Sequence, residues 1–257
     1  MKNKPSIAPE IIRMLKDMEV IFASFRVDFY IVGATARDYH LSAAEEAAAL
    51  RKTDDVDLAI LLNDAGQFNS IKAELIESGK FTAHPTEHIK LFYEGRIEVD
   101  LLPFGKIEAG NGMVFLQPPN SFSLSMPGFK EVYPFVEEIV SEDGLSIKLC
   151  PLEGIIILKL ISYRDRPERT KDISDIEHIF DVFFNLCDEN IYDEHFDLMD
   201  KYDVEEPNYF QIISARVIGR KMGEILKSSN KLDAMIKSML IKRYEYWVEP
   251  LLEGLAD

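Results

Sequence analysis

The feature that most constrains the fold of this chain is a change of hydrophobic pattern at Pro151. Before this residue, short β-prone runs alternate with helix-like segments. After it, apolar residues recur at helical spacing as far as Leu255. This order predicts an α+β fold, in which an N-terminal domain built on a mixed sheet precedes an all-helical C-terminal domain.

The individual elements are predicted from periodicity and turn residues. Helices are expected over residues 8–23, 42–50 and 69–78. Strands are expected over residues 27–32, 56–62, 89–93, 97–102 and 113–116, with further edge strands over 132–139 and 145–149. Residues 117–130 are rich in Pro, Ser and Gly, which predicts a loop. We therefore place the domain boundary between residues 117 and 152, and assign the domains to 1–125 and 126–257.

Charge and hydropathy exclude several classes of function. The formal net charge of −16 over 257 residues disfavours non-specific contact with phosphate backbones, so extensive nucleic-acid binding is not expected. The longest apolar run, residues 58–62, is far too short for a membrane span, and the N-terminus lacks the apolar run of a signal peptide. These features predict a cytoplasmic protein with no membrane partner.

The stretch Thr53-Asp54-Asp55-Val56-Asp57-Leu58 carries the most specific chemistry. Alternation along a strand places Asp55 and Asp57 on one face, while Val56 and Leu58 point into a core. Two neighbouring carboxylates repel each other unless a cation lies between them, and Mg²⁺ prefers oxygen ligands. The alternative for so short a pattern is an edge strand with a solvated acidic face.

Two further segments favour the metal-site interpretation. Asp100, flanked by apolar residues in a second β-prone run, would supply a third carboxylate, with Glu98 as the fallback ligand. Two metal ions held in this way can clamp the attacking and leaving oxygens of a phosphoryl displacement. The run Tyr30 to Asp38 reads as a strand that ends at Gly33 and opens a helix, whose N-terminal N–H groups favour phosphate. For that run alone, an ordinary strand-to-helix turn is the simpler interpretation.

Taken together, these segments resemble nucleotidyltransferases. Residues 32–38 resemble the V-G-G-A-x-R-D turn of tRNA CCA-adding enzymes and poly(A) polymerases, and residues 53–58 resemble the T-x-D-[IV]-D-[LIV] strand of the DNA polymerase β-like superfamily. The resemblance implies a nucleotidyltransferase domain that binds Mg²⁺ or Mn²⁺ through Asp55, Asp57 and Asp100. It also implies contact with a nucleoside triphosphate at Gly33, Thr35 and Arg37. Ala34 departs from the usual Gly or Ser, which leaves room for an inactive site.

The helical half contains the densest basic cluster of the chain, consisting of Lys159, Arg164, Arg166, Arg169 and Lys171. Lys159 interrupts an apolar helix, and an unpaired buried ammonium is costly. It binds the triphosphate together with the rest of this basic cluster, pairs with Asp172 or Asp175 to fasten two helices, or does both. We expect the catalytic cleft between the two halves, with the basic cluster facing the carboxylates.

The segment from Pro151 to Asp175 is similar to a motif of bacterial nucleotidyltransferases related to the AbiEii toxins, and these resemblances span roughly residues 10 to 185. They imply transfer of a nucleoside monophosphate from a nucleoside triphosphate to an unidentified hydroxyl or phosphate acceptor. One alternative is a toxin-type enzyme that modifies tRNA or protein and pairs with an antitoxin partner. Another is an inactive relative that binds a nucleotide or a partner protein.

Overall fold

A computed structural model describes residues 6–42, 55–116 and 122–257 of the chain. These residues divide into two compact units. Residues 6–39, 55–116 and 122–151 form the first, here called the sheet unit, and residues 40–42 and 152–257 form the second, the helical unit. None of the helices in the described ranges combines the length and apolar character that a membrane crossing requires.

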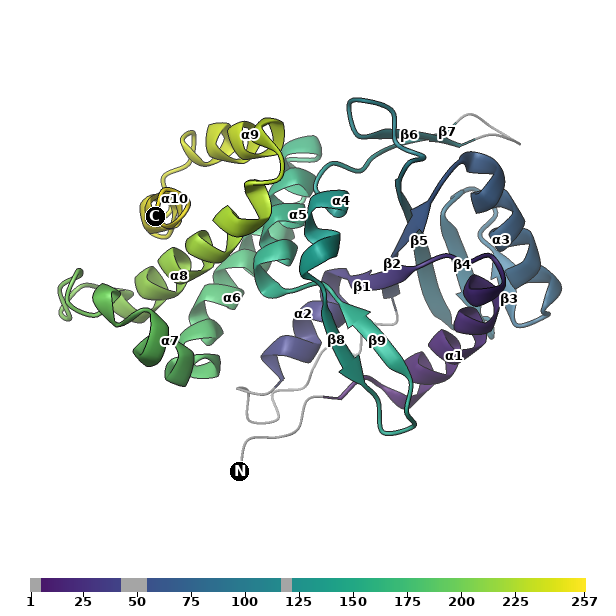
Figure 1. Cartoon of the computed structure of the whole chain (residues 1–257), viewed down its shortest axis with the longest axis horizontal. Helices are drawn as coiled ribbons and strands as arrows, with labels where there is room; N and C mark the ends of the chain where they lie inside the picture. Colours follow the sequence, from purple (N-terminus) through teal and green to yellow (C-terminus); the bar gives the residue numbers. More distant parts are fainter. Residues whose placement is uncertain (1–5, 43–54, 117–121) are drawn as a thin grey trace. The chain divides into compact units, whose positions relative to one another are not determined.

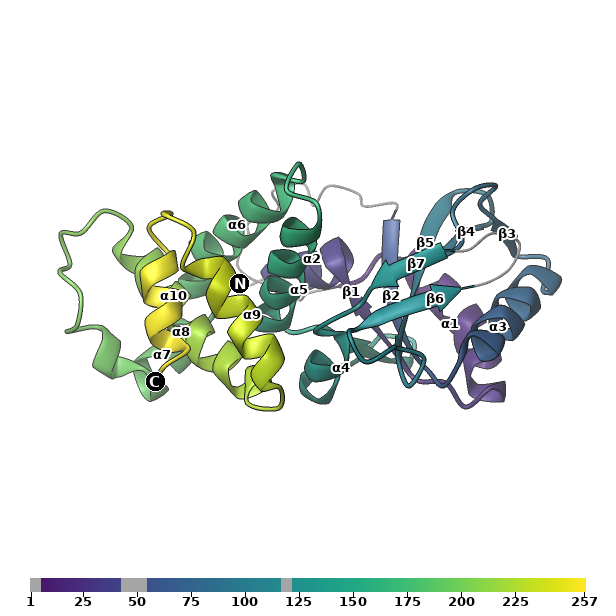
Figure 2. The same ribbon diagram turned by 90° about the horizontal axis from the view of Figure 1, so that it is seen from above.

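The sheet unit is built on a mixed seven-stranded sheet in the order β3-β4-β5-β2-β1-β9-β8 (Figure 1). The strands are β1 (Phe29–Val32), β2 (Asp55–Leu62), β3 (Phe81–Ala83), β4 (Lys90–Tyr93), β5 (Ile97–Gly105), β8 (Glu137–Val140) and β9 (Ser146–Leu149). β2 pairs in parallel with β5 and antiparallel with β1. β6 (Met113–Leu116) and β7 (Phe122–Ser125) pair antiparallel in a separate two-stranded sheet, as Figure 2 shows from above.

One face of the sheet is covered by α1 (Pro9–Ser24) and α3 (Ala65–Glu77), which also contact each other. α1 begins with a proline in its first turn and buries apolar residues at helical spacing, among them Leu15 and Phe22. The ring of Phe22 lies 5.0 Å from that of Phe29 on β1. α3 begins at Asp64, whose carboxylate accepts a hydrogen bond from the backbone N–H of Gln67.

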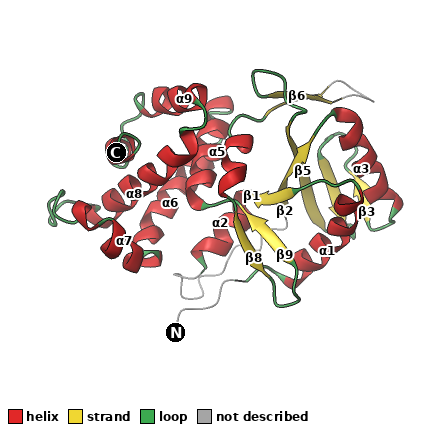
Figure 3. Ribbon diagram, viewed as in Figure 1, coloured by secondary structure: helices red, strands yellow, loops and turns green. Residues whose placement is uncertain are grey.

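The helical unit consists of α5 (Leu152–Asp165), α6 (Lys171–Leu186), α7 (Asp188–Glu194), α8 (Tyr209–Leu226), α9 (Asn230–Leu240) and α10 (Val248–Gly254). Figure 3 shows its helices in red. α8 packs against α5, α6, α9 and α10 and is buried along most of its length. α8 passes very close to α10 (Figure 2). A Cβ atom added at Gly254 of α10 would lie only 2.2 Å from the carbonyl oxygen of Arg216 on α8.

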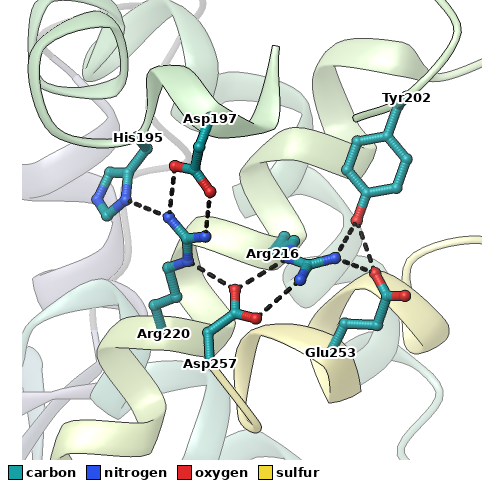
Figure 4. A network of polar contacts seen from close by, with 7 residues as sticks. All are labelled: His195, Asp197, Tyr202, Arg216, Arg220, Glu253 and Asp257. Carbon is teal, nitrogen blue, oxygen red and sulfur yellow. Dashed lines mark hydrogen bonds and ion pairs between the residues drawn. The ribbon is translucent and has the colours of Figure 1, made fainter. Parts of the chain in front are cut away.

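An ion-pair network fastens the end of the chain to α8 (Figure 4). Arg216 is only 4% exposed and donates hydrogen bonds to Glu253 and Asp257. Arg220, one turn further along α8, also donates to Asp257, at 2.7 Å, and to Asp197 at 2.6 Å. Because each guanidinium holds two carboxylates, the loop before α8 and the segment after α10 are tied to the same helix.

The predicted fold class, a mixed sheet followed by helices, is confirmed. The predicted helix over 69–78 begins earlier, at Ala65, because Asp64 caps it. The predicted helix over 42–50 lies almost entirely outside the described residues. The helix α2 (Gly33–Leu41) begins at the predicted glycine turn. The short helix α4 (Phe129–Val132) was not predicted, and it begins in the predicted loop of 117–130.

Other local predictions were wrong for identifiable reasons. The predicted loop over 117–130 also contains β7, whose serine-rich sequence is stabilised as a strand by pairing with β6. The strand predicted over 132–139 begins only at Glu137, because Pro134 lies in a short 3₁₀ turn, Tyr133–Phe135. β9 is an inner strand rather than an edge strand, since it pairs with both β1 and β8. β9 and β8 together complete one side of the seven-stranded sheet.

Candidate functional site

The candidate site is a row of acidic side chains on the two central strands β2 and β5. Asp57 is paired in register with Asp100, and Asp55 with Glu98. Val56 and Leu58 are buried between these positions, as the alternation of a strand requires. The sheet therefore brings two acidic pairs from separate parts of the chain onto neighbouring strands.

These acids lie on the face of the sheet opposite α1 and α3. The reference point is Tyr93 on β4, whose hydroxyl donates to Asp17 of α1 at 2.7 Å. Since successive residues of a strand alternate between faces, Lys90 lies on the other face from Tyr93. Lys90 is paired in register with Asp100, which is in turn paired with Asp57, so all three side chains share the face that α1 leaves open.

Gly33, where β1 ends and α2 begins, lies directly against Asp57. Val32 is paired in register with Asp57, and Gly33 adopts a left-handed conformation with φ of 65°. A Cβ atom at Gly33 would lie 2.1 Å from Oδ2 of Asp57. Both the backbone conformation and the close approach of the carboxylate therefore require glycine here.

The other two residues of the turn make contacts within the protein. The hydroxyl of Thr35, which is 8% exposed, donates to the backbone carbonyl of Asp55 at 3.3 Å. The guanidinium of Arg37 donates to the carboxylate of Asp38 through Nε at 2.8 Å and through a terminal nitrogen at 2.6 Å. Thr35 thus ties the first turn of α2 to the start of β2. Their contact with a triphosphate stays a prediction.

Asp100, on β5, differs from an exposed carboxylate in having a buried oxygen. Its Oδ1 atom is buried and accepts no hydrogen bond from the described residues. The ammonium of Lys90 lies 3.9 Å from that oxygen. Burial raises the pKa of the Asp100 carboxyl, and Lys90 opposes this effect only in part.

Lys90 is a site residue that the sequence analysis missed. Its ammonium lies 2.5 Å from Oε2 of Glu98, and the hydrogen bond lowers the pKa of Glu98 and raises that of Lys90. A signal was present, since Gly95 marks a turn between two β-prone runs. Counting outward from a hairpin around Gly95 places Lys90 opposite Asp100.

The donor set of this face fits a hard divalent cation in its chemistry. Carboxylates of Asp57 and Asp100 are in register on adjacent strands, and one buried oxygen of Asp100 has no hydrogen-bond donor in the described part of the chain. However, within residues 6–42, 55–116 and 122–257, no three or more His, Cys, Asp or Glu side chains are gathered as metal ligands. Metal binding by Asp55, Asp57 and Asp100 therefore stays a prediction.

In the helical unit, Lys159 has two carboxylate partners. Its ammonium lies 3.2 Å from Asp172 and 2.6 Å from Asp175, so it fastens α5 to α6. The side chain of Lys159 is 13% exposed and that of Asp172 only 8%. Of the two roles weighed for Lys159, the structure shows the ion pair.

The rest of the basic cluster is more exposed. Arg164 pairs with Asp165 at 2.6 Å, and Arg169 lies 3.9 Å from Asp172. Arg166 and Lys171 are exposed to solvent. Their binding of triphosphate, and the expectation that the cluster faces the carboxylates, stay predictions.

Comparisons with known proteins identify no family for this chain. A scan against protein-family models finds no match, and a search of curated proteins finds no relative. Among solved structures, the solution structure of the antibiotic-resistance factor ANT(2'')-Ia is similar, with a TM-score of 0.40 and 13% sequence identity. The match covers 82% of this chain and 93% of that one. Similarity at this level does not identify a function, so the function proposed for this protein rests on its own residues.

Proposed function

We propose that this protein is a metal-dependent nucleotidyltransferase, which moves a nucleoside monophosphate from a nucleoside triphosphate to a hydroxyl or phosphate acceptor. The observation that supports this most directly is the arrangement around Asp57. Its carboxylate is in register with Asp100 on one side and lies against the Gly33 turn on the other. Acidic ligands thereby stand next to a helix N-terminus, where phosphate is favoured.

In this proposal each residue has a defined task. Asp55 and Asp57 hold Mg²⁺ or Mn²⁺, which when bound neutralises phosphate charge. The N-terminal N–H groups of α2, beginning at Gly33, bind the phosphates. Asp100 orients the acceptor and takes its proton. The acceptor oxygen then forms a bond to the α-phosphorus, the bond from that phosphorus to the bridging oxygen breaks, and pyrophosphate leaves.

The decisive experiment is incubation of the protein with Mg²⁺, a cell lysate and each nucleoside triphosphate carrying a radiolabelled α-phosphate. We expect label to enter an acceptor with the wild-type protein and not with Asp57→Asn or Asp100→Asn. Asp143→Asn is the matched control, because Asp143 is an acid of the sheet unit that pairs with Lys16 and is 65% exposed. Equal labelling by the wild-type and Asp57→Asn proteins would refute the proposal.

A second candidate is an inactive relative that binds a nucleotide without turning it over. It is favoured by Ala34 in the turn and by the ion pair of Lys90 with Glu98 on the acidic face. The two candidates differ in one outcome. An inactive relative would show Mg²⁺-dependent thermal stabilisation by the nucleotide, worth about 2.7 kcal/mol at a hundredfold excess over Kd, but no labelled product.

A further inference from the structure

Lys90 places a positive charge among the carboxylates of the acidic face. Its ammonium contacts Glu98 at 2.5 Å and lies 3.9 Å from the buried Oδ1 atom of Asp100. Both carboxylates belong to β5, and Lys90 comes from the neighbouring strand β4. Lys90 thus forms ion pairs with two carboxylates of this acidic row.

The position of Lys90 is set by the backbone. Its N–H donates to the carbonyl of Glu87 at 3.3 Å, and its own carbonyl accepts from the N–H of His84 at 3.1 Å. The antiparallel register then aligns Lys90 with Asp100 across the strands. The side chain is only 17% exposed, so the ammonium is held in a restricted position rather than moving freely in solvent.

We propose that the ammonium of Lys90 takes the place of the second divalent cation, so that the acidic face binds a single metal ion through Asp55 and Asp57. This inference rests on the proposed function. In a two-metal site, the second cation would be held beside the third carboxylate, here Asp100. The ammonium of Lys90 already lies 3.9 Å from Oδ1 of Asp100 and 2.5 Å from Glu98 on the same strand. A second divalent cation beside Asp100 would be repelled by the ammonium.

Lys90 would then act as a positioning residue for Asp100. Its positive charge compensates the carboxylate of Asp100, whose buried Oδ1 atom accepts no hydrogen bond from the described residues. Because a lysine side chain cannot dissociate as a metal ion does, this compensation would be present before the nucleotide arrives. The site would therefore hold one divalent cation during the reaction instead of two.

The test measures the number of Mn²⁺ ions bound per chain, by following free Mn²⁺ in electron paramagnetic resonance titrations of the full chain without nucleotide. The variants are Lys90→Met, Lys90→Arg and Lys90→Met/Asp100→Asn. Lys80→Met is the matched control, because Lys80 is a lysine of the sheet unit that pairs with Asp17 of α1, on the opposite face. Circular dichroism verifies that each variant folds, and Lys90→Gln replaces Lys90→Met if the latter does not.

We expect one Mn²⁺ for the wild-type, Lys90→Arg and Lys80→Met proteins, and two for Lys90→Met. The second ion should bind Lys90→Met about tenfold or more tightly than any second ion binds the wild type, and Asp100→Asn should abolish it. Two ions in the wild-type protein, or identical binding by Lys90→Met and wild type, would overturn the inference and leave the proposed function standing. Binding of no Mn²⁺ by any of these proteins would overturn both.

Discussion

Replacement of Gly33 by alanine tests whether the turn and the acidic row form one structure. The new Cβ atom would occupy a left-handed residue with φ of 65° and lie 2.1 Å from Oδ2 of Asp57. The left-handed backbone costs about 1–2 kcal/mol for a residue with a side chain. Forcing an extra methyl group into a packed site costs a further ~1–3 kcal/mol. We therefore expect the free energy of unfolding to fall by about 3 kcal/mol.

Two further variants separate these contributions. Gly79 has φ of 76° and no atom within 4 Å of an added Cβ, so Gly79→Ala reports the backbone cost alone, about 1 kcal/mol. Asp57→Ala removes the carboxylate and leaves the Cβ atom of residue 57 at 3.4 Å from the Cβ atom added at Gly33, which is an ordinary van der Waals distance. In the background of Asp57→Ala, the cost of Gly33→Ala should fall to that of Gly79→Ala.

The assay is equilibrium unfolding in urea, followed by circular dichroism, for the four proteins of this double-mutant cycle and for Gly79→Ala. A coupling energy of about 2 kcal/mol between Gly33→Ala and Asp57→Ala is expected. If Gly33→Ala costs no more than Gly79→Ala, or if the two changes are additive, the carboxylate of Asp57 does not lie against the turn and the argument for the site is refuted.

Three more predictions concern Asp57, Lys159 and the ion pair of Arg216 with Asp257. Asp57→Asn should abolish nucleotidyl transfer while the metal-free protein keeps or gains stability, because one of several like charges is removed; a loss of stability in urea unfolding would instead assign Asp57 a structural role. Lys159→Met should lower the free energy of unfolding by about 3–5 kcal/mol, because the buried carboxylate of Asp172 then has only the more distant and exposed Arg169, at 3.9 Å, in place of the ammonium, and it should not alter the thermal shift caused by nucleotide; the opposite pattern would make Lys159 a phosphate ligand. The hydrogen bond from Arg216 lowers the pKa of Asp257 from 3.8 to about 2, and a depressed carboxyl pKa stabilises the fold above the unfolded-state value. This contribution, about 1 kcal/mol after allowance for solvent screening, should be lost as the pH falls from about 4 to 2, and Asp257→Asn should remove that part of the pH dependence of unfolding.

Much of the local structure could be predicted from the sequence because its causes are local. Apolar spacing in residues 8–23 predicted a helix, which the structure places at Pro9–Ser24. Alternation in the run from Asp55 to Leu58 predicted that the two acids share a face. The change of pattern at Pro151 predicted the helices that follow. Periodicity of this kind depends only on the geometry of a single helix or strand.

Where the sequence misled, the deciding interactions were between segments. Residues 122–125 read as loop by composition, and pairing with β6 makes them a strand. Lys159 read equally well as a phosphate ligand or as a helix fastener, and only the packing of α6 beside α5 brings Asp172 and Asp175 to it. No local pattern contains the identity of the partner, because that partner is set by how the elements pack.

The acidic site shows the same division. The sequence by itself determined which residues could bind a cation, namely Asp55, Asp57 and Asp100, and that a glycine would end the strand before them. Tertiary structure alone decided that Asp57 and Asp100 stand in register, that Gly33 lies against Asp57, and that Lys90 joins the row. The physical reason is that strand order and register are set by pairing between residues far apart in the chain, whereas residue chemistry and alternation are properties of each strand.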